Sequence, residues 1–287
     1  MIALAGGRPR AGRALRMPGD ALARAGLALV VVSVGMAVLA PLLAPFGPDA
    51  IDYRAMLQGP SPAHLLGTDD LGRDVFTRLL YGGRLSLGVG VASVVLAVVA
   101  GVPIGLLSGY LGGIADEILM RVIDSVMAMP PLVLALTITA VLGPGLANAM
   151  LAIAIVAVPA FTRLVRGQVL SVKHEDYVMA AQSVGARPSR LVLRHILPNA
   201  INPVIVQAAL GVGFAMITES SVSFIGLGAQ PPTATWGSMV QVGFQYLETA
   251  PWLALAPAVM IFLAVLGFTM LGEGLRGLLD PAVRARG

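Results

Sequence analysis

A chain of 287 residues that is 57% hydrophobic and 12% charged, with a mean hydropathy of +0.85, is far too apolar for a soluble globular enzyme. The absence of cysteine excludes disulfides, thiolate zinc sites, iron–sulfur clusters and cysteine nucleophiles. The formal net charge is +4, but the basic residues stand between long apolar runs, which favours a role in membrane topology over a nucleic-acid surface.

Six apolar runs are long enough to cross a bilayer, because about 20 residues at 1.5 Å each cover the roughly 30 Å of hydrocarbon. Gly143, Pro144 and Gly145 divide one stretch that is too long for a single span, which predicts two spans joined by a tight hairpin turn. We therefore expect an all-α integral membrane protein with six transmembrane helices. Their predicted positions are residues 25–44, 85–110, 118–142, 146–161, 200–224 and 248–273.

Basic residues near the span ends indicate orientation, because cytoplasmic loops retain Lys and Arg. The larger group is Arg8, Arg10, Arg13, Arg16, Arg24, Arg121, Arg163, Arg166, Lys173, Arg187, Arg190, Arg194, Arg276, Arg284 and Arg286; the smaller, on the other side, is Arg54, Arg73, Arg78 and Arg84. Both termini are thus predicted to be cytoplasmic, with a tail over residues 1–24 and a six-span domain over 25–287. A cleaved signal peptide is the alternative for the N-terminus, but the first apolar run is longer than a signal core.

The first predicted outer loop, residues 46–84, contains the sequence LGTDDLGRD at residues 66–74. Thr68 is suited to cap a short helix, with Asp69 and Asp70 near its positive end. The residues alone favour an interfacial helix that seals the outer mouth.

The predicted cytoplasmic loop, residues 163–199, is the longest polar stretch between two spans, and its pattern predicts two short helices. The first covers about 175–184 and ends at Gly185, a residue suited to a left-handed turn. The second begins at Pro188 and ends before Pro198. Tyr177, Ala180, Ala181 and Val184 form an apolar face on the first helix, whereas Leu191 and Ile196 lie among Arg187, Arg190 and Arg194 on the second. Such a pair suits a groove on a partner protein, or equally the anionic headgroups of a membrane.

Two further residues stand out on the predicted outer side. Trp236, in the loop 225–239, is typical of an anchor at the membrane interface, with substrate contact as the alternative. Glu219 falls near the outer end of the fifth span, where an ionisable group suggests a function. The alternatives are a position just inside the membrane interface or a hydrogen bond to a neighbouring helix.

Two patterns within the spans favour structural roles. Arg121 and Asp124 are three residues apart on one helix and are expected to pair with each other. Gly101, Gly105 and Gly109 recur every four residues and predict close packing of the second span on another helix.

The sequence lacks the motifs of several enzymes. The only lysine, Lys173, follows Val172, so there is no phosphate-binding P-loop in this chain. His174 and Glu175 begin a zincin-like motif, but Val178 stands where the second histidine ligand is needed. No histidine or lysine lies within a predicted span to activate Ser220, Ser221 or Ser223 as a nucleophile.

The two loops and the 225–239 segment together resemble the permease subunits of ATP-binding-cassette importers, specifically the C-type subunits of the dipeptide, oligopeptide and nickel family. The likeness extends from about residue 25 to 283. The cytoplasmic loop is similar to that superfamily's EAA motif, as Met179-Ala180-Ala181, then Gly185, then Leu197-Pro198. Met179 stands where the motif has Glu, and His195 stands where it usually has Ile.

The resemblance implies the fold of type I importer permeases and a bacterial cytoplasmic (inner) membrane location. It implies three kinds of partner: a homologous second permease, two ATPase subunits that bind ATP and Mg, and an extracytoplasmic solute-binding protein. This chain would be a non-enzymatic half of the translocation pathway, with no cofactor or metal of its own. The residues implied in ATPase coupling are Tyr177, Met179, Ala180, Ala181, Gly185, Arg187, Arg194, His195, Leu197 and Pro198. Those placed to face the binding protein or to guard the outer mouth are Asp69, Asp70, Arg73, Asp74 and Trp236.

Peptides are the expected cargo, and nickel chelates, glutathione or glycosides are the alternatives within the same class. An ion-gradient secondary transporter or a gated channel are the alternatives from other classes. Neither has a need for the paired-helix cytoplasmic loop, and a secondary transporter is expected to show internal repeats and midplane charges.

Overall fold

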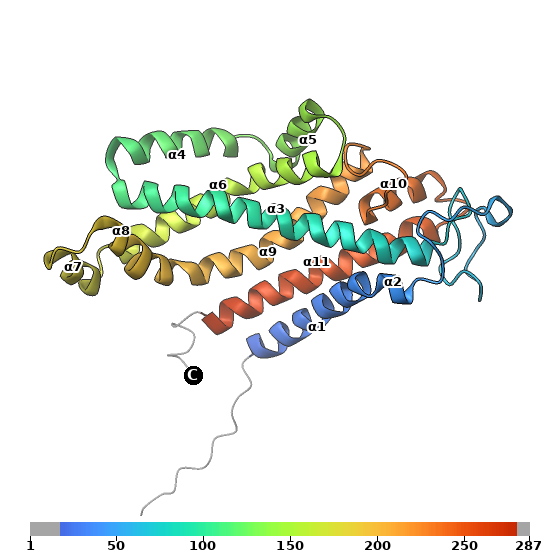
Figure 1. The fold of residues 1–287 in the computed structure, drawn as a ribbon, viewed down its shortest axis with the longest axis horizontal. Coiled ribbons are helices and arrows are strands. Elements are labelled where there is room, and N and C mark those ends of the chain that lie inside the picture. The colour runs from blue at the N-terminus through green and yellow to red at the C-terminus, as the bar shows by residue number, and fades with distance from the viewer. Residues whose placement is uncertain (1–17, 280–287) are drawn as a thin grey trace, which may run out of the picture.

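The computed structural model describes residues 18–279, and within that range it is a bundle of helices joined by loops (Figure 1). The α-helices are α1 (Pro18–Val38), α2 (Ala40–Leu43), α3 (Val75–Leu111), α4 (Gly113–Met127), α5 (Pro131–Leu142), α6 (Leu146–Val172), α7 (Asp176–Ser183), α8 (Pro188–Arg190), α9 (Leu197–Phe224), α10 (Trp236–Gln245) and α11 (Trp252–Leu279). A 3-10 turn, η1 (Tyr53–Ala55), and a π-helical segment, η2 (Leu191–Ile196), complete the set.

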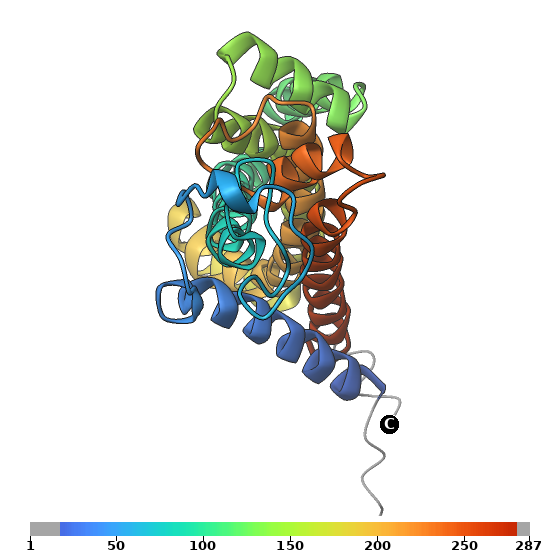
Figure 2. The same ribbon diagram turned by 90° about the vertical axis from the view of Figure 1, so that its right-hand side faces the viewer.

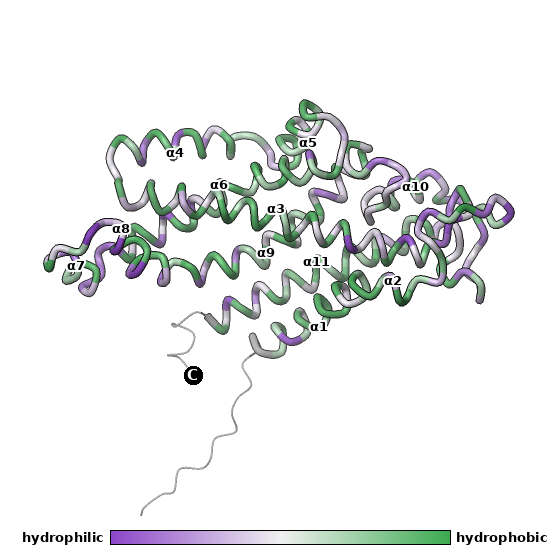
Figure 3. The backbone as a smooth tube through the Cα atoms, in the orientation of Figure 1, coloured by the Kyte–Doolittle hydropathy of each residue, from purple (hydrophilic) through white to green (hydrophobic). Residues whose placement is uncertain are grey.

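The long helices run along one axis of the molecule. The α7 end carries α7 and α8, and the opposite α10 end carries α10 and the loop that leads into α3 (Figure 1). Apolar residues predominate along the helices between the two ends (Figure 3). Five helical segments are long and apolar enough to cross a membrane: 21–38, α3, α6, Pro188–Phe224 and 252–278. The α4–α5 pair supplies a sixth if the two helices form one span, so the six-span prediction fits this architecture.

The third predicted span, 118–142, is not one helix. It is broken between α4 and α5, which meet at an angle of 89°. Pro130 and Pro131 cause the break, since proline offers no N–H to a preceding carbonyl and disfavours helical geometry in the residue before it. The prediction of an uninterrupted span is therefore wrong.

Several predicted boundaries also differ. The helix α1 begins before residue 25, α3 begins ten residues before 85 and takes up 75–84 of the predicted outer loop, and α6 extends beyond 161 through 163–172 of the predicted cytoplasmic loop. A helix continues past the hydrophobic run because nothing in the flanking residues stops it. The tail 1–17 and the residues 280–287, with Arg284 and Arg286, lie outside the described part of the chain.

The helices α3 and α6 pack closely against each other, which confirms the predicted glycine packing. A Cβ placed on Gly105 would lie 2.6 Å from the carbonyl oxygen of Thr162 and 2.8 Å from the Cβ of Val165. Gly101 and Gly109 meet α6 in the same way, next to Phe161 and Val169. Only glycine allows the two backbones to approach this closely. Viewed along the long axis, α4 and α5 lie on one side of the bundle and α1 on the opposite side (Figure 2).

Candidate functional site

The α7 end contains the predicted coupling segment. The helix α7 begins after Glu175 and ends at Ser183, close to the predicted limits, and Gly185 follows with φ of +82°. This left-handed conformation is the one for which glycine was predicted at this position. No other atom lies within 4 Å of a Cβ placed on Gly185, so the backbone angle alone disfavours a side chain there.

Most of α7 is exposed. Val178 is buried and attaches the helix to the bundle, whereas Tyr177, Met179 and Ala180 are exposed. Val184, just beyond the helix, is 86% exposed. The predicted apolar face therefore exists as an uncovered surface, except that Ala181 is half-buried against the bundle.

The second predicted helix does not end before Pro198. It starts at Pro188 as predicted, passes through η2 and continues into α9, so that Pro188–Phe224 is one helical run. Pro198 lies in the first turn of α9, where the π-helical geometry of η2 has already changed the hydrogen-bond pattern and a proline is tolerated. Leu191 and Ile196 are buried, and Arg187 and Arg194 are exposed beside them.

A polar contact joins α7 to the base of α9. The side-chain amide of Asn199 donates to the hydroxyl of Tyr177 at 2.9 Å and to the carbonyl oxygen of His195 at 2.7 Å. The rings of Tyr177 and His195 lie 6.4 Å apart. Sequence reasoning named Tyr177 and His195 but missed Asn199, whose only signal was its position directly after Pro198. The predicted coupling residues are thus brought together, across α7, the Gly185 turn, η2 and the start of α9.

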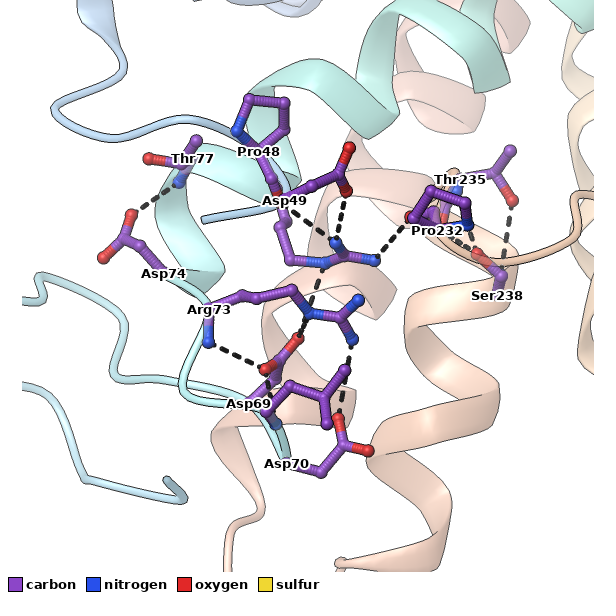
Figure 4. A network of polar contacts seen from close by, with 12 residues as sticks. Pro48, Asp49, Asp69, Asp70, Arg73, Asp74, Thr77, Pro232, Thr235 and Ser238 are labelled. Atoms are coloured by element: carbon purple, nitrogen blue, oxygen red, sulfur yellow. Dashed lines mark hydrogen bonds and ion pairs between the residues drawn. The ribbon is translucent and has the colours of Figure 1, made fainter. Parts of the chain in front are cut away.

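At the α10 end, Asp69 is the centre of a buried polar network (Figure 4). One oxygen of its carboxylate accepts from the backbone N–H of Leu71 and of Arg73, both at 2.9 Å. The other oxygen accepts from Nε of Arg73 at 2.7 Å and lies 3.5 Å from Nε of Arg78. The loop 69–73 is therefore folded around a carboxylate that faces two guanidinium groups.

Arg78 connects this loop to two distant segments. Its guanidinium donates to the carbonyl oxygens of Pro48 at 3.0 Å and Pro232 at 3.4 Å, and it pairs with Asp49 at 3.3 Å. We call the network of Asp49, Asp69, Asp70, Arg73 and Arg78 the arginine clamp (Figure 4). The sequence did not indicate that Arg78 belongs to such a network, because its partners are about 30 and 150 residues away.

The predicted helix cap at Thr68 is wrong. Asp74 caps α3 instead, accepting from the N–H of Thr77 at 2.8 Å, and its other oxygen contacts Nδ1 of His64 at 2.9 Å. Asp74 directly precedes the helix, whereas Thr68 pairs with it in an isolated bridge and bonds to the carbonyl oxygen of Ala55. The expectation that Asp69, Arg73 and Asp74 face a partner is corrected. These three side chains are buried and bond to other residues of this chain, so they shape the loop.

Trp236 is 1% exposed and is not an interfacial anchor, which corrects a second expectation. Its indole Nε1 donates to the carbonyl oxygen of Leu79 at 2.8 Å, and its backbone N–H donates to Oγ of Ser86 at 3.0 Å. Glu219 is completely buried beside it, where it accepts from Ser223 at 2.8 Å and from Ser86 at 3.4 Å. Glu219 and Trp236 thus tie α9 and α10 to α3 through the hydroxyl of Ser86.

The predicted pair Arg121–Asp124 does not form. Arg121 pairs with Glu117 at 3.3 Å, one turn earlier on the exposed side of α4, while Asp124 pairs with Arg163 of α6. Arg166 makes a bidentate contact with Asp116, at 2.6 and 2.7 Å. Because α6 continues past residue 161, Arg163 and Arg166 reach the acidic residues of α4, and Arg163 takes the place that Arg121 was predicted to have beside Asp124.

Titratable side chains are not gathered into a metal site in the part of the chain that the structure describes: no group of three His, Asp or Glu residues there is placed to hold an ion. His64 lies at the α10 end, and His174 and His195 lie near the α7 end.

Comparisons with known proteins agree with this architecture. Residues 101–285 match the family described as the binding-protein-dependent transport system inner membrane component, and residues 19–60 match the N-terminal TM domain of oligopeptide transport permease C. A dipeptide transport system permease protein from Alkalihalophilus pseudofirmus is 46% identical over 92% of this chain and 87% of its own length. A glutathione transport system permease protein from Pectobacterium atrosepticum is 43% identical over 89% of this chain and 85% of its own.

Among solved structures, an inward-facing MetNI methionine ABC transporter chain matches with a TM-score of 0.54 and 21% identity, covering 73% of this chain and 96% of that one. This likeness concerns the fold, which is that of type I importer permeases. With a family match over most of the chain, and relatives above 40% identity at nearly full length, the protein belongs to the inner membrane permease components of binding-protein-dependent, ATP-binding-cassette transport systems.

Proposed function

We propose that this permease forms one half of the pathway of an ATP-driven importer for small peptides. The relatives named above carry dipeptide or glutathione in their names, and both molecules are short chains joined by amide bonds. The proposed partners are a homologous second permease, two ATPase subunits and an extracytoplasmic solute-binding protein. ATP and Mg would be bound by the ATPase subunits, with both termini and the α7 end in the cytoplasm.

The observation that carries the coupling role is the uncovered face of α7. Val178 is the one buried residue of α7, and Tyr177, Met179 and Ala180 are exposed. A helix exposed in this way is suited to dock in a groove on another protein. Because α7 is tied by Asn199 to the start of α9, a displacement of the docked helix would reach a membrane span directly. Differential contacts of α7 with the two states of the ATPase pair would then move this span.

The test is reconstitution of the complete transporter in liposomes, with ATP-driven dipeptide uptake compared between wild type and Ala180→Asp. Ala180 is exposed, so the aspartate leaves the fold of the free subunit intact but places a charge in the docked surface. We expect uptake to fall by at least about tenfold, since an unpaired charge in a protein interface costs about 2–5 kcal/mol. Ala63→Asp is the matched control, because Ala63 is also exposed but lies in the loop at the α10 end.

A second variant, Gly185→Pro, tests the turn itself, because proline cannot adopt a φ of +82°. Uptake equal to wild type in both Ala180→Asp and Gly185→Pro would refute the coupling role of α7. Wild-type flux that needs no ATP would refute the importer mechanism and favour transport driven by an ion gradient. ATP-driven uptake of glycosides or nickel chelates in place of peptides would overturn the assignment of cargo alone.

A further inference from the structure

A cavity of about 380 Å³ lies midway along the membrane-spanning helices. Its walls are the α4–α5 break, with Met129 and Pro131, the middle of α6, with Ala157 and Phe161, and the middle of α9, with Phe214. Non-helical backbone at membrane depth is tolerated only where protein covers it or where it lines a water-filled space. Because the α4–α5 break lines this cavity, we expect the cavity to contain water.

Gln207 is the one polar side chain among the described residues that line this cavity. It lies near the middle of the helical run Pro188–Phe224, far from either end of the bundle. It is only partly buried, and its side-chain amide makes no hydrogen bond with any residue that the structure describes. An amide in this position needs a partner, because hydrocarbon offers none.

The hydroxyls within the same helices show the contrast. Thr162 donates to the carbonyl oxygen of Val158, and Thr218 donates to that of Phe214, each four residues earlier on its own helix. Thr139 does the same with Ala135. These side chains are satisfied without any help from outside, whereas the longer Gln207 projects into the cavity and stays free.

We infer that Gln207 is a specificity-determining residue of the translocation pathway, and that its side chain exchanges hydrogen bonds with the main-chain amide of the passing peptide. A glutamine amide has two N–H donors and one carbonyl acceptor, so it complements a peptide group in both directions. It carries no charge, so it forms no ion pair with either terminus of a zwitterionic peptide. The apolar walls around it accept side chains of different size without a fixed pocket.

This inference rests on the proposed function, and its test has one arm that does not need transport. The chain contains no cysteine, so Gln207→Cys introduces its single thiol. In the assembled complex, a charged, water-soluble thiol reagent is expected to modify this position, as followed by the mass of this chain. Phe262→Cys is the matched control, since Phe262 is 62% exposed on α11, away from the cavity. We expect at least tenfold faster modification at position 207, because only hydrated thiols ionise and react. Equal rates would overturn the placement of Gln207 in a hydrated pathway.

The second arm measures ATP-driven uptake at saturating binding protein for a dipeptide and for the same dipeptide methylated at its amide nitrogen. Gln207→Leu keeps the volume and remains compatible with the membrane, and Gln207→Asn keeps the amide. The loss of one neutral hydrogen bond corresponds to about a 2- to 12-fold reduction. We expect this reduction for the dipeptide in Gln207→Leu and partial recovery in Gln207→Asn. The reduction is expected to be smaller for the methylated peptide, which keeps its carbonyl acceptor but has lost its N–H donor.

Thr269→Val, which removes a hydroxyl from an exposed position of α11, serves as the uptake control. An equal effect of Gln207→Leu on both peptides would overturn amide recognition while leaving the importer assignment intact. If the wild type itself takes up no dipeptide, the proposed function fails, and the labelling arm still decides whether Gln207 faces water.

Discussion

The arginine clamp makes a quantitative prediction for Asp69→Asn. Asparagine has the same shape as aspartate and keeps a carbonyl oxygen for the backbone N–H groups of Leu71 and Arg73, but it removes the charge that faces the two arginine side chains. The side chains of Asp69, Arg73 and Arg78 are only 7%, 10% and 9% exposed, so solvent screens this charge weakly.

The magnitude follows from the contacts that remain. Removing one member of a buried ion pair costs about 3–5 kcal/mol. After the substitution, Arg73 still has Asp70 at 3.6 Å and Arg78 still has Asp49 at 3.3 Å, both more exposed than Asp69. We therefore expect the lower end, about 3 kcal/mol, of lost stability against local opening of the loop.

Hydrogen exchange measures this opening directly. The N–H groups of Leu71 and Arg73 donate to Asp69, and a loss of about 3 kcal/mol corresponds to about 150-fold faster exchange, at 1.36 kcal/mol for each factor of ten. Asp70→Asn is the matched control: Asp70 is 29% exposed and makes a longer contact, worth at most about 1 kcal/mol, or about fivefold. Equal exchange over residues 69–73 in the two variants would refute the reasoning that a buried carboxylate holds the clamp.

Two further predictions concern packing and buried polarity. Gly105→Ala forces a Cβ to within 2.6 Å of a backbone oxygen of α6 and is expected to lower the free energy of unfolding by about 1–3 kcal/mol. Gly88→Ala on the same helix meets nothing within 4 Å and should be neutral or stabilising. If the two variants unfold at the same midpoint in detergent, the close packing of α3 on α6 is contradicted. Glu219→Ala removes the acceptor of Ser86 and Ser223 and should destabilise the protein by about 1–3 kcal/mol. Glu219→Gln keeps a carbonyl oxygen and should lose much less stability. Equal losses of stability in thermal denaturation would show that the hydrogen bonds of Glu219 contribute nothing.

Local signals in the sequence predicted the local features of the structure. The hairpin at Gly143–Gly145 and the turn at Gly185 depend on backbone conformations that few residues other than glycine adopt, so single residues indicate them. The glycine spacing of α3 was equally informative, because a four-residue repeat lies on one face of a helix. The Pro130-Pro131 break could also have been predicted, but the absence of charges in 118–142 made one span the simpler interpretation.

The arginine clamp and the Trp236 contacts could not be predicted in the same way. Arg78 bonds to Pro48 and Pro232, and Trp236 bonds to Leu79 and Ser86, so each contact depends on the tertiary arrangement of loops that no periodicity describes. Similarly, Asp124 pairs with Arg163 because α6 extends past its apolar run. For charged residues near a membrane surface the sequence suggests external partners or chain neighbours, whereas the fold brings distant residues such as Asp124 and Arg163 together.

The helical run Pro188–Phe224 has a mechanical consequence. Its 37 residues, at 1.5 Å each, make a rod of about 55 Å, so a tilt of one degree about the α8 end moves the far end by about 1 Å. Near that far end, Glu219 and Ser86 are 3.4 Å apart, already close to the limit of a hydrogen bond. A few degrees of tilt are therefore enough to separate α9 from α3 there. A small rotation at one membrane surface can open a contact at the other, without any change within the helix itself.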